Sequence, residues 1–155
     1  MQQVLSGLAS LQGLPERISA QNVLLLTYGG GARNPGILRL IESWRCNLLH
    51  FPFSTALLEG DQVSEVFEVF EGLRFRPDVL VSVGGGAVLD LAKCLKLLFD
   101  CPSTVLLSHE ERNWQKNTLH VAVPTTAGTG SEATPFATVY QGETKHSVED
   151  PRLIP

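Results

Sequence analysis

Short apolar segments alternate with amphipathic segments along the chain. Segments typical of buried strands occur at 23–27, 47–51 and 79–83, and glycine runs follow the first and the last of them. Between and after these segments, apolar residues recur with the i, i+3, i+4, i+7 spacing that lies on one face of a helix. The three sets are Ile37, Leu40, Ile41 and Trp44; Val63, Val66, Phe67 and Phe70; and Val88, Leu91, Ala92 and Leu95.

These patterns predict where the helices and the remaining strands lie. The first helix is expected to start just after Pro35 and Gly36, and the second to have Asp61 as its N-cap and to end before Pro77. Further strands are expected at 105–107, 119–123 and 136–140, and the chain opens with an amphipathic stretch. The apolar residues of that opening stretch are Val4, Leu5, Leu8 and Leu11.

Alternation of strands and helices predicts the α/β class. Such a chain builds a Rossmann-like open parallel sheet with helices on both faces. No repeat, low-complexity segment or linker interrupts the pattern, so residues 1–155 are expected to form one domain. A hydrophobic content of 43% is enough for a core of that size.

Charge and hydropathy narrow the range of partners. The formal net charge is -4, so the chain offers no basic surface and we expect no nucleic-acid partner. No apolar stretch reaches the roughly 18 residues that cross a bilayer, so we expect no membrane partner and a cytoplasmic location. Cys46, Cys94 and Cys101 are odd in number and lack metal-ligand spacing, which favours reduced thiols packed in the core.

Ligands of an open parallel sheet bind beyond the carboxyl ends of the strands, which directs attention to three loops. The loop at 84–87 lies between an apolar strand and a helix, where backbone N–H groups can approach a phosphate. It departs from the G-x-G-x-x-G pattern because Leu89 occupies the last position, and a tight structural turn would use the same glycines.

The other two loops follow the strands at 23–27 and 119–123. Gly30, Gly31 and Arg33 form a candidate phosphate site, although a solvated surface arginine is the alternative. The loop at 124–132 combines hydroxyls and glycines that can line a ribose or an adenine. Ser131 and Glu132 are better explained as the first residues of a helix than as catalytic groups.

Two segments, 78–93 and 123–136, together resemble the paired signature of the iron-containing alcohol dehydrogenase family, and the resemblance extends from about residue 23 to 155. The resemblance implies a NAD(P)-dependent, metal-assisted alcohol dehydrogenase or aldehyde reductase with a small-molecule alcohol or aldehyde as substrate. It implies that this chain supplies the cofactor-binding domain, and it allows a homo-oligomer.

The family's cofactor contacts carry over residue by residue. The residues that the resemblance places at the diphosphate are Gly84, Gly85, Gly86 and Ala87. Ala87 stands where the family usually has serine, so one hydroxyl contact is lost. The resemblance also implies that Asp90 lies near the cofactor and that Lys145 lies near the nicotinamide ribose. The residues matched to the adenosine and ribose contacts are Thr125, Thr126, Gly128, Thr129 and Thr134.

The choice between NADP and NAD depends on the residue after the first strand. NAD-preferring members of the family tend to have an aspartate there, where it repels a 2′-phosphate, and this chain has Tyr28. The sequence around Tyr28 is similar to that of the butanol-dehydrogenase branch. We therefore favour NADP, with Arg33 facing the extra phosphate.

The family's Fe2+ or Zn2+ site uses an aspartate and three histidines of an all-helical second domain, which begins after the segment at Asp150 and Pro151. We expect that domain, its metal and any catalytic residue to be absent from this chain, and the chain alone to be inactive. The histidines lack the i, i+4 pairing of a helical ligand set and are interpreted as ordinary residues. They are His50, His109, His120 and His146.

Three alternatives remain open at this stage. The chain is either part of such an enzyme, a free-standing nucleotide-binding module, or a truncated non-catalytic homologue whose apolar surface contacts other chains. Within the enzyme reading, the segments at 134–140 and 145–147 resemble the phosphonoacetaldehyde reductase branch.

Overall fold

A parallel four-stranded sheet forms the centre of the computed structural model, which describes residues 2–5, 10–102, 104–108 and 111–155. Its strands are β1 (Asn22–Tyr28), β2 (Asn47–Phe53), β3 (Val79–Gly84) and β4 (Leu119–Pro124), in the order β2-β1-β3-β4. In the register of the sheet, Leu25 of β1 lies between His50 of β2 and Val81 of β3. All four strands were predicted from the sequence.

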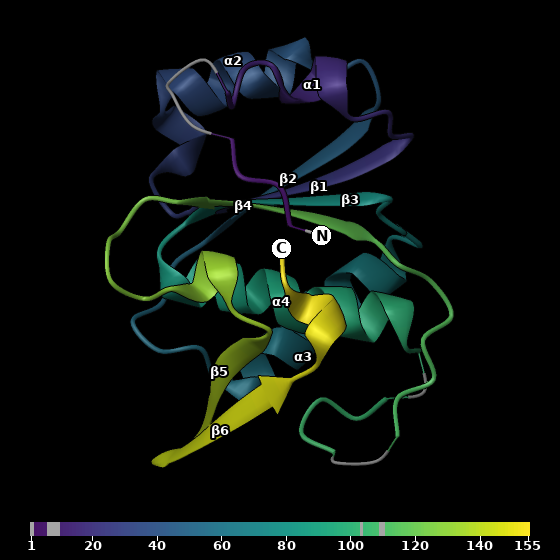
Figure 1. The fold of residues 1–155 in the computed structure, drawn as a ribbon, viewed down its shortest axis with the longest axis vertical. Coiled ribbons are helices and arrows are strands. Elements are labelled where there is room, and N and C mark those ends of the chain that lie inside the picture. Colours follow the sequence, from purple (N-terminus) through teal and green to yellow (C-terminus); the bar gives the residue numbers. More distant parts are fainter. Residues whose placement is uncertain (1, 6–9, 103, 109–110) are drawn as a thin grey trace.

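Helices cover both faces of this sheet, as predicted (Figure 1). One face carries α1 (Leu14–Arg17) and α2 (Pro35–Ser43), and the other carries α3 (Gly60–Gly72) and α4 (Gly86–Asp100). Side chains alternate along a strand, so Val23 and Leu25 pack with α2 while Leu24 and Leu26 pack with α3 and α4. Both faces of β1 are therefore buried, which explains its continuous apolar run.

Capping side chains fix where α2 and α3 begin. The Oδ1 of Asn34 accepts hydrogen bonds from the N–H groups of Gly36 at 2.8 Å and Ile37 at 3.3 Å, so α2 begins at Pro35, before the predicted start. Asp61 is not the N-cap of α3. Glu59 has that place and forms a capping box with Gln62, whose Oε1 accepts from the Glu59 N–H at 3.0 Å.

An antiparallel hairpin of β5 (Phe136–Gln141) and β6 (Thr144–Glu149) packs against α4, on the side of the helix away from the sheet (Figure 1). The segment at 136–140 is thus a strand, as predicted, but it does not join the parallel sheet. The sequence showed no strand at β6 because only Val148 in it is buried. Gly142 forms the turn with φ of 61°, a left-handed conformation that favours glycine.

The strand expected at 105–107 is absent from the structure. The segment at 105–107 is a turn closed by the Ser108 N–H and the Val105 carbonyl at 2.9 Å, with Val105 72% exposed. At the start of the chain, residues 2–5 have no regular structure and Val4 is 85% exposed, while Leu8 lies outside the described residues. The described residues also form three short 3-10 helices: η1 (Gly31–Arg33), η2 (Ser131–Ala133) and η3 (Pro151–Leu153). No helix in the described ranges is long and apolar enough to cross a membrane.

Candidate functional site

The connections of the sheet run in opposite directions from its two central strands. The chain leaves β1 through α2 to reach β2 at one edge, and it leaves β3 through α4 to reach β4 at the other edge. The two loops therefore separate at the carboxyl ends of β1 and β3, which is the usual place of a ligand crevice in an open α/β sheet.

The N-terminus of α4 faces this point without a side-chain cap. Gly85 is its N-cap residue, and no side chain of the described residues caps the first turn. The first N–H groups of a helix have no partner within the helix, and the helix dipole adds partial positive charge there. The start of α4 therefore has the chemistry to hold an anionic group such as a diphosphate.

The loops after β3 and β4 lie against each other at this end of the sheet. The N–H of Thr125 donates to the carbonyl of Gly84 at 2.9 Å. A Cβ atom at Gly85 would stand 3.0 Å from Oγ1 of Thr126, and one at Gly86 would stand 3.1 Å from Cγ2 of Thr129. The glycines thus allow the two loops to approach, which is a packing role in addition to any contact with a ligand.

A cavity of about 270 Å³ lies between α4, η2, the hairpin and the segment before α3. Six of the residues predicted to bind a cofactor line it, and they are Gly86, Ala87, Asp90, Thr129, Thr134 and Lys145. Its apolar wall includes Leu57 and Phe136, which are 50% and 41% exposed. The cavity thus combines hydroxyls, one carboxylate, one ammonium and exposed apolar side chains.

The other predicted residues lie outside this cavity. Gly84, Gly85, Thr125, Thr126 and Gly128 belong to the two touching loops, and residues 124–129 are exposed. Gly30, Gly31 and Arg33 lie in the loop after β1.

Packing accounts for the glycines of the loop after β1. Gly31 is buried, and a Cβ atom there would overlap the side chain of Thr27. A Cβ atom at Gly30 would stand 3.1 Å from the ring of Tyr28. Arg33 is exposed, so its side chain is free to turn toward a ligand at this end of the sheet.

Asp90 links α4 to the segments that line the cavity from the other side. Its Oδ1 accepts from the Ser131 hydroxyl at 2.5 Å, and its Oδ2 accepts from the Thr138 N–H at 3.0 Å. Sequence reasoning singled out Asp90 but missed both partners. Ser131 is the first residue of η2, as expected for a helix start, and it also lines the cavity.

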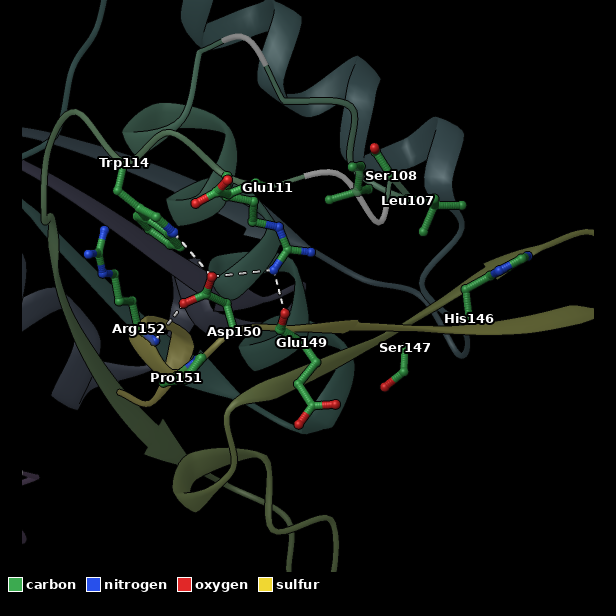
Figure 2. Close-up of a pocket in the computed structure, with 12 residues that line it drawn as sticks. Leu107, Ser108, Glu111, Trp114, His146, Ser147, Glu149, Asp150, Pro151 and Arg152 are labelled. Atoms are coloured by element: carbon green, nitrogen blue, oxygen red, sulfur yellow. Dashed lines mark hydrogen bonds and ion pairs between the residues drawn. The ribbon is translucent and has the colours of Figure 1, made fainter.

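A second and larger cavity of about 580 Å³ lies between residues 106–108 and 111–114 on one side and the end of β6 on the other (Figure 2). Trp114 and Asp150 meet on one side of it, where the indole Nε1 donates to Oδ2 at 3.1 Å and Arg112 lies 3.6 Å from the same carboxylate. None of the residues predicted to bind a cofactor lines this cavity. Size alone therefore does not identify the functional site.

Comparison with known proteins identifies the family to which this fold belongs. The family model described as iron-containing alcohol dehydrogenase matches residues 2–155. The chain belongs to this family. Its parallel sheet and the loops at 84–87 and 124–132 are thus the iron-containing alcohol dehydrogenase version of the α/β fold.

Individual members of the iron-containing alcohol dehydrogenase family show how far the similarity reaches. An NADPH-dependent butanol dehydrogenase of Clostridium saccharobutylicum is 27% identical over 163 residues, covering 96% of this chain and 40% of the relative. A phosphonoacetaldehyde reductase of Streptomyces viridochromogenes is 39% identical over 90 residues, covering 52% of this chain and 23% of the relative. A solved iron-containing alcohol dehydrogenase of Thermococcus thioreducens superposes with a TM-score of 0.80 and 25% identity, over 96% of this chain and 42% of that one. The chain spans less than half the length of each of these relatives.

The described part of this chain contains no ligand set suited to the iron after which the family is named. No group of three or more His, Cys, Asp or Glu side chains in that part is arranged to hold a metal ion. His50 Nε2 lies 2.8 Å from the Thr27 hydroxyl and His120 Nε2 lies 2.8 Å from the Ser82 hydroxyl, so each histidine has a partner within the sheet.

Burial lowers the pKa values of the two histidines in the sheet, and two of the three cysteines are also buried. Burial lowers the pKa of His120 to about 3, with Lys93 and Lys96 adding to the shift, and it also lowers the pKa of His50. His146 is half-buried on β6, and His109 lies outside the described residues. Cys94 and Cys101 are buried free thiols, as predicted, whereas Cys46 is half-buried.

Proposed function

We propose that this chain supplies the nicotinamide dinucleotide site of an alcohol dehydrogenase or aldehyde reductase. The observation that carries the proposal is the uncapped N-terminus of α4, which lies at the switch point of the sheet and beside the 270 Å³ cavity. Family membership supports the same assignment.

Each part of the site has a proposed role. The backbone N–H groups around Gly85 and Gly86 bind the diphosphate, and the exposed residues 124–128 contact the adenosine half. The hydroxyls of Thr129 and Thr134 and the ammonium of Lys145 bind the nicotinamide ribose inside the cavity.

Asp90 has the capacity to join these contacts. Each of its oxygens already accepts one bond from the protein, and a carboxylate oxygen has a second lone pair for a ribose hydroxyl.

The nicotinamide, when bound, accepts a hydride from an alcohol or donates one to an aldehyde. The chain's own contribution is to orient the ring and to exclude water from one of its faces. Leu57 and Phe136 are suited to this because they present exposed apolar surface at the cavity.

The loop after β1 favours NADP. Tyr28 ends the strand where an acidic side chain would repel a 2′-phosphate, and its hydroxyl accepts from Nδ2 of Asn34 at 3.1 Å. Arg33 follows on the same loop and is exposed. The similarity to an NADPH-dependent butanol dehydrogenase, which covers nearly the whole chain, supports this preference.

The proposed substrate is a small aldehyde or the corresponding alcohol. The relative with 39% identity is a phosphonoacetaldehyde reductase, which supports an aldehyde that carries an anionic group. The similarity covers 52% of this chain.

Calorimetric titration of the chain with NADP+ and with NAD+ tests the proposal. Saturable binding of NADP+ is expected, and Arg33→Ala should weaken it about tenfold, the loss of one hydrogen bond to a charged group, while NAD+ binding stays unchanged. Arg39→Ala removes the same charge from an exposed position on α2 and serves as the control. Absence of binding by the folded chain would overturn the dinucleotide site, and equal losses for both cofactors would overturn the role of Arg33.

A further inference from the structure

Lys93 is a fully buried cation on α4, with 0% of its side chain exposed. Its ammonium donates to the Ser131 hydroxyl at 3.1 Å, the Thr134 hydroxyl at 3.4 Å and the Phe136 carbonyl at 2.8 Å. These three acceptors match the three protons of the ammonium. Asp90, one turn earlier on α4, lies 3.9 Å away and supplies the opposite charge.

All the partners of Lys93 line the 270 Å³ cavity, whereas Lys93 itself does not. They are Asp90, Ser131, Thr134 and Phe136. Ser131, Thr134 and Phe136 belong to the segment that leaves the parallel sheet after β4 and continues into β5. Because β5 pairs with β6 and not with the parallel sheet, strand pairing with that sheet does not fix the position of this segment. The Lys93 ammonium and the Asp90 carboxylate together make five hydrogen bonds with residues 131–138.

Stability alone does not explain a charge at this position. Burial of a lysine is costly, and desolvation lowers the pKa of Lys93 although Asp90 opposes the shift. Replacing a buried ion pair by apolar side chains of similar volume often leaves a protein equally stable. What an apolar side chain does not supply is directional bonding to two hydroxyls and a carbonyl.

We propose that Lys93 is a positioning residue of the dinucleotide site, which sets the distance between α4 and the wall formed by Ser131, Thr134 and Phe136. The inference rests on the proposed function, because the wall has this use only if a dinucleotide occupies the cavity. Lys93 acts through these neighbours and does not touch the ligand.

Lys93→Met provides the test, with Lys96→Met as a matched control. Lys96 lies on the same helix and is 2% exposed, but its ammonium bonds Asp100, Asn117 and the Thr118 carbonyl, away from the cavity. Both variants lose a buried ammonium from α4. The folded fraction of each is established first, by circular dichroism and urea unfolding.

Two readouts separate positioning from stability. The first is amide hydrogen exchange, which should become at least about tenfold faster at 131–138 in Lys93→Met than in Lys96→Met, as loss of charge-assisted hydrogen bonds implies. The second is calorimetric titration with NADP+. Its dissociation constant should rise about tenfold in Lys93→Met and change less than twofold in Lys96→Met.

Lys93→Gln keeps the test decisive if Lys93→Met does not fold. A glutamine amide retains donors without the charge, so the exchange rate and the dissociation constant should lie between those of the original chain and of Lys93→Met. Equal NADP+ affinity in the original chain and the Lys93 variants would overturn the inference. An equal loss of NADP+ affinity in the Lys93 and Lys96 variants would also overturn the inference. If the original chain binds no dinucleotide, the proposed function fails, and the exchange pattern alone shows whether Lys93 holds the wall.

Discussion

His120 shows at the scale of one residue how burial in the sheet decides the behaviour of a titratable group. Its side chain is 4% exposed on β4, with Nε2 at the Ser82 hydroxyl and Nδ1 without a hydrogen-bond partner among the described residues. Lys93 and Lys96 on α4 add positive charge nearby, so a proton on the imidazole is disfavoured twice. The ring therefore stays neutral in the folded protein down to a pH of about 3.

This shift predicts how stability depends on pH. The unfolded chain takes up a proton on His120 near pH 6.5, whereas the folded chain does so only near the lowered pKa of about 3. The unfolded state thus binds more protons below pH 6.5, and stability is lost as the pH falls. Between pH 7 and pH 5, His120 should account for a loss of about 2 kcal/mol in the free energy of unfolding.

Urea unfolding of the original chain and of His120→Gln at pH 7 and pH 5 checks this expectation. The variant should lose less stability between the two pH values than the original chain does. His146→Gln, at a half-buried position on β6, controls for the removal of a histidine. An identical pH dependence in the original chain and in His120→Gln would contradict the assignment.

At the scale of one element, α4 carries more polar groups into the core than its apolar pattern suggests. Lys93, Lys96 and Asp100 are all buried in it, together with the apolar residues at the predicted spacing. Asp100 accepts from the Lys96 ammonium at 3.0 Å, from the Thr118 N–H at 2.9 Å and from the Thr118 hydroxyl at 2.6 Å. The cluster ties the end of α4 to the residue before β4.

Removing Asp100 should therefore be costly. Asp100→Ala leaves the Lys96 ammonium buried without its counter-ion, and we expect a loss of about 3–5 kcal/mol in the free energy of unfolding, measured by urea unfolding. Glu71→Ala breaks the 2.6 Å ion pair between Glu71 and Arg76, whose side chains are 41% and 49% exposed. This change should lower the free energy of unfolding by less than about 1 kcal/mol. Similar losses in the two variants would show that the buried pair contributes no more than the exposed one.

The elements that could be predicted are those whose apolar period is long and uninterrupted. β1 and β3 follow such patterns because both of their faces are buried, and α4 follows one because the sheet covers one side of the helix and the hairpin covers another. β6 could not be predicted since five of its six residues are not buried. The capping box at Glu59 was also missed, because Asp61 and Glu59 are both acidic and only the geometry distinguishes them.

For the candidate site, glycine runs and hydroxyl-rich loops after apolar strands indicated which loops meet, since parallel strands bring their carboxyl ends to one edge. The contribution of the hairpin through Thr138 and Tyr140 depends on how β5 packs against α4. A local pattern contains no information on that packing. The partners of Lys93 could not be predicted for the same reason, because in the sequence Lys93 is not distinguishable from other helix residues.

In the molecule as a whole, the two central strands of the sheet are the elements best protected from solvent. β1 and β3 each have a hydrogen-bonded neighbour on both sides and side chains buried on both faces, whereas β2 and β4 are the edge strands of the sheet. Amide hydrogen exchange should therefore be slowest in β1 and β3 and faster in β2, β4 and the hairpin. Mass spectrometry of exchanged peptides measures this order. Faster exchange in β1 than in the hairpin would contradict it.

The tight contact of Gly31 with Thr27 has a consequence for how this sequence can evolve. Thr27 also bonds His50 on the neighbouring strand, so a side chain at position 31 collides with a group that is held from the other direction. Substitutions at positions 27 and 31 are then not independent, and their order matters. A smaller residue must first replace Thr27, which releases His50, before position 31 accepts anything larger than glycine. Lineages descended from this protein should thus change position 31 only where position 27 has already changed.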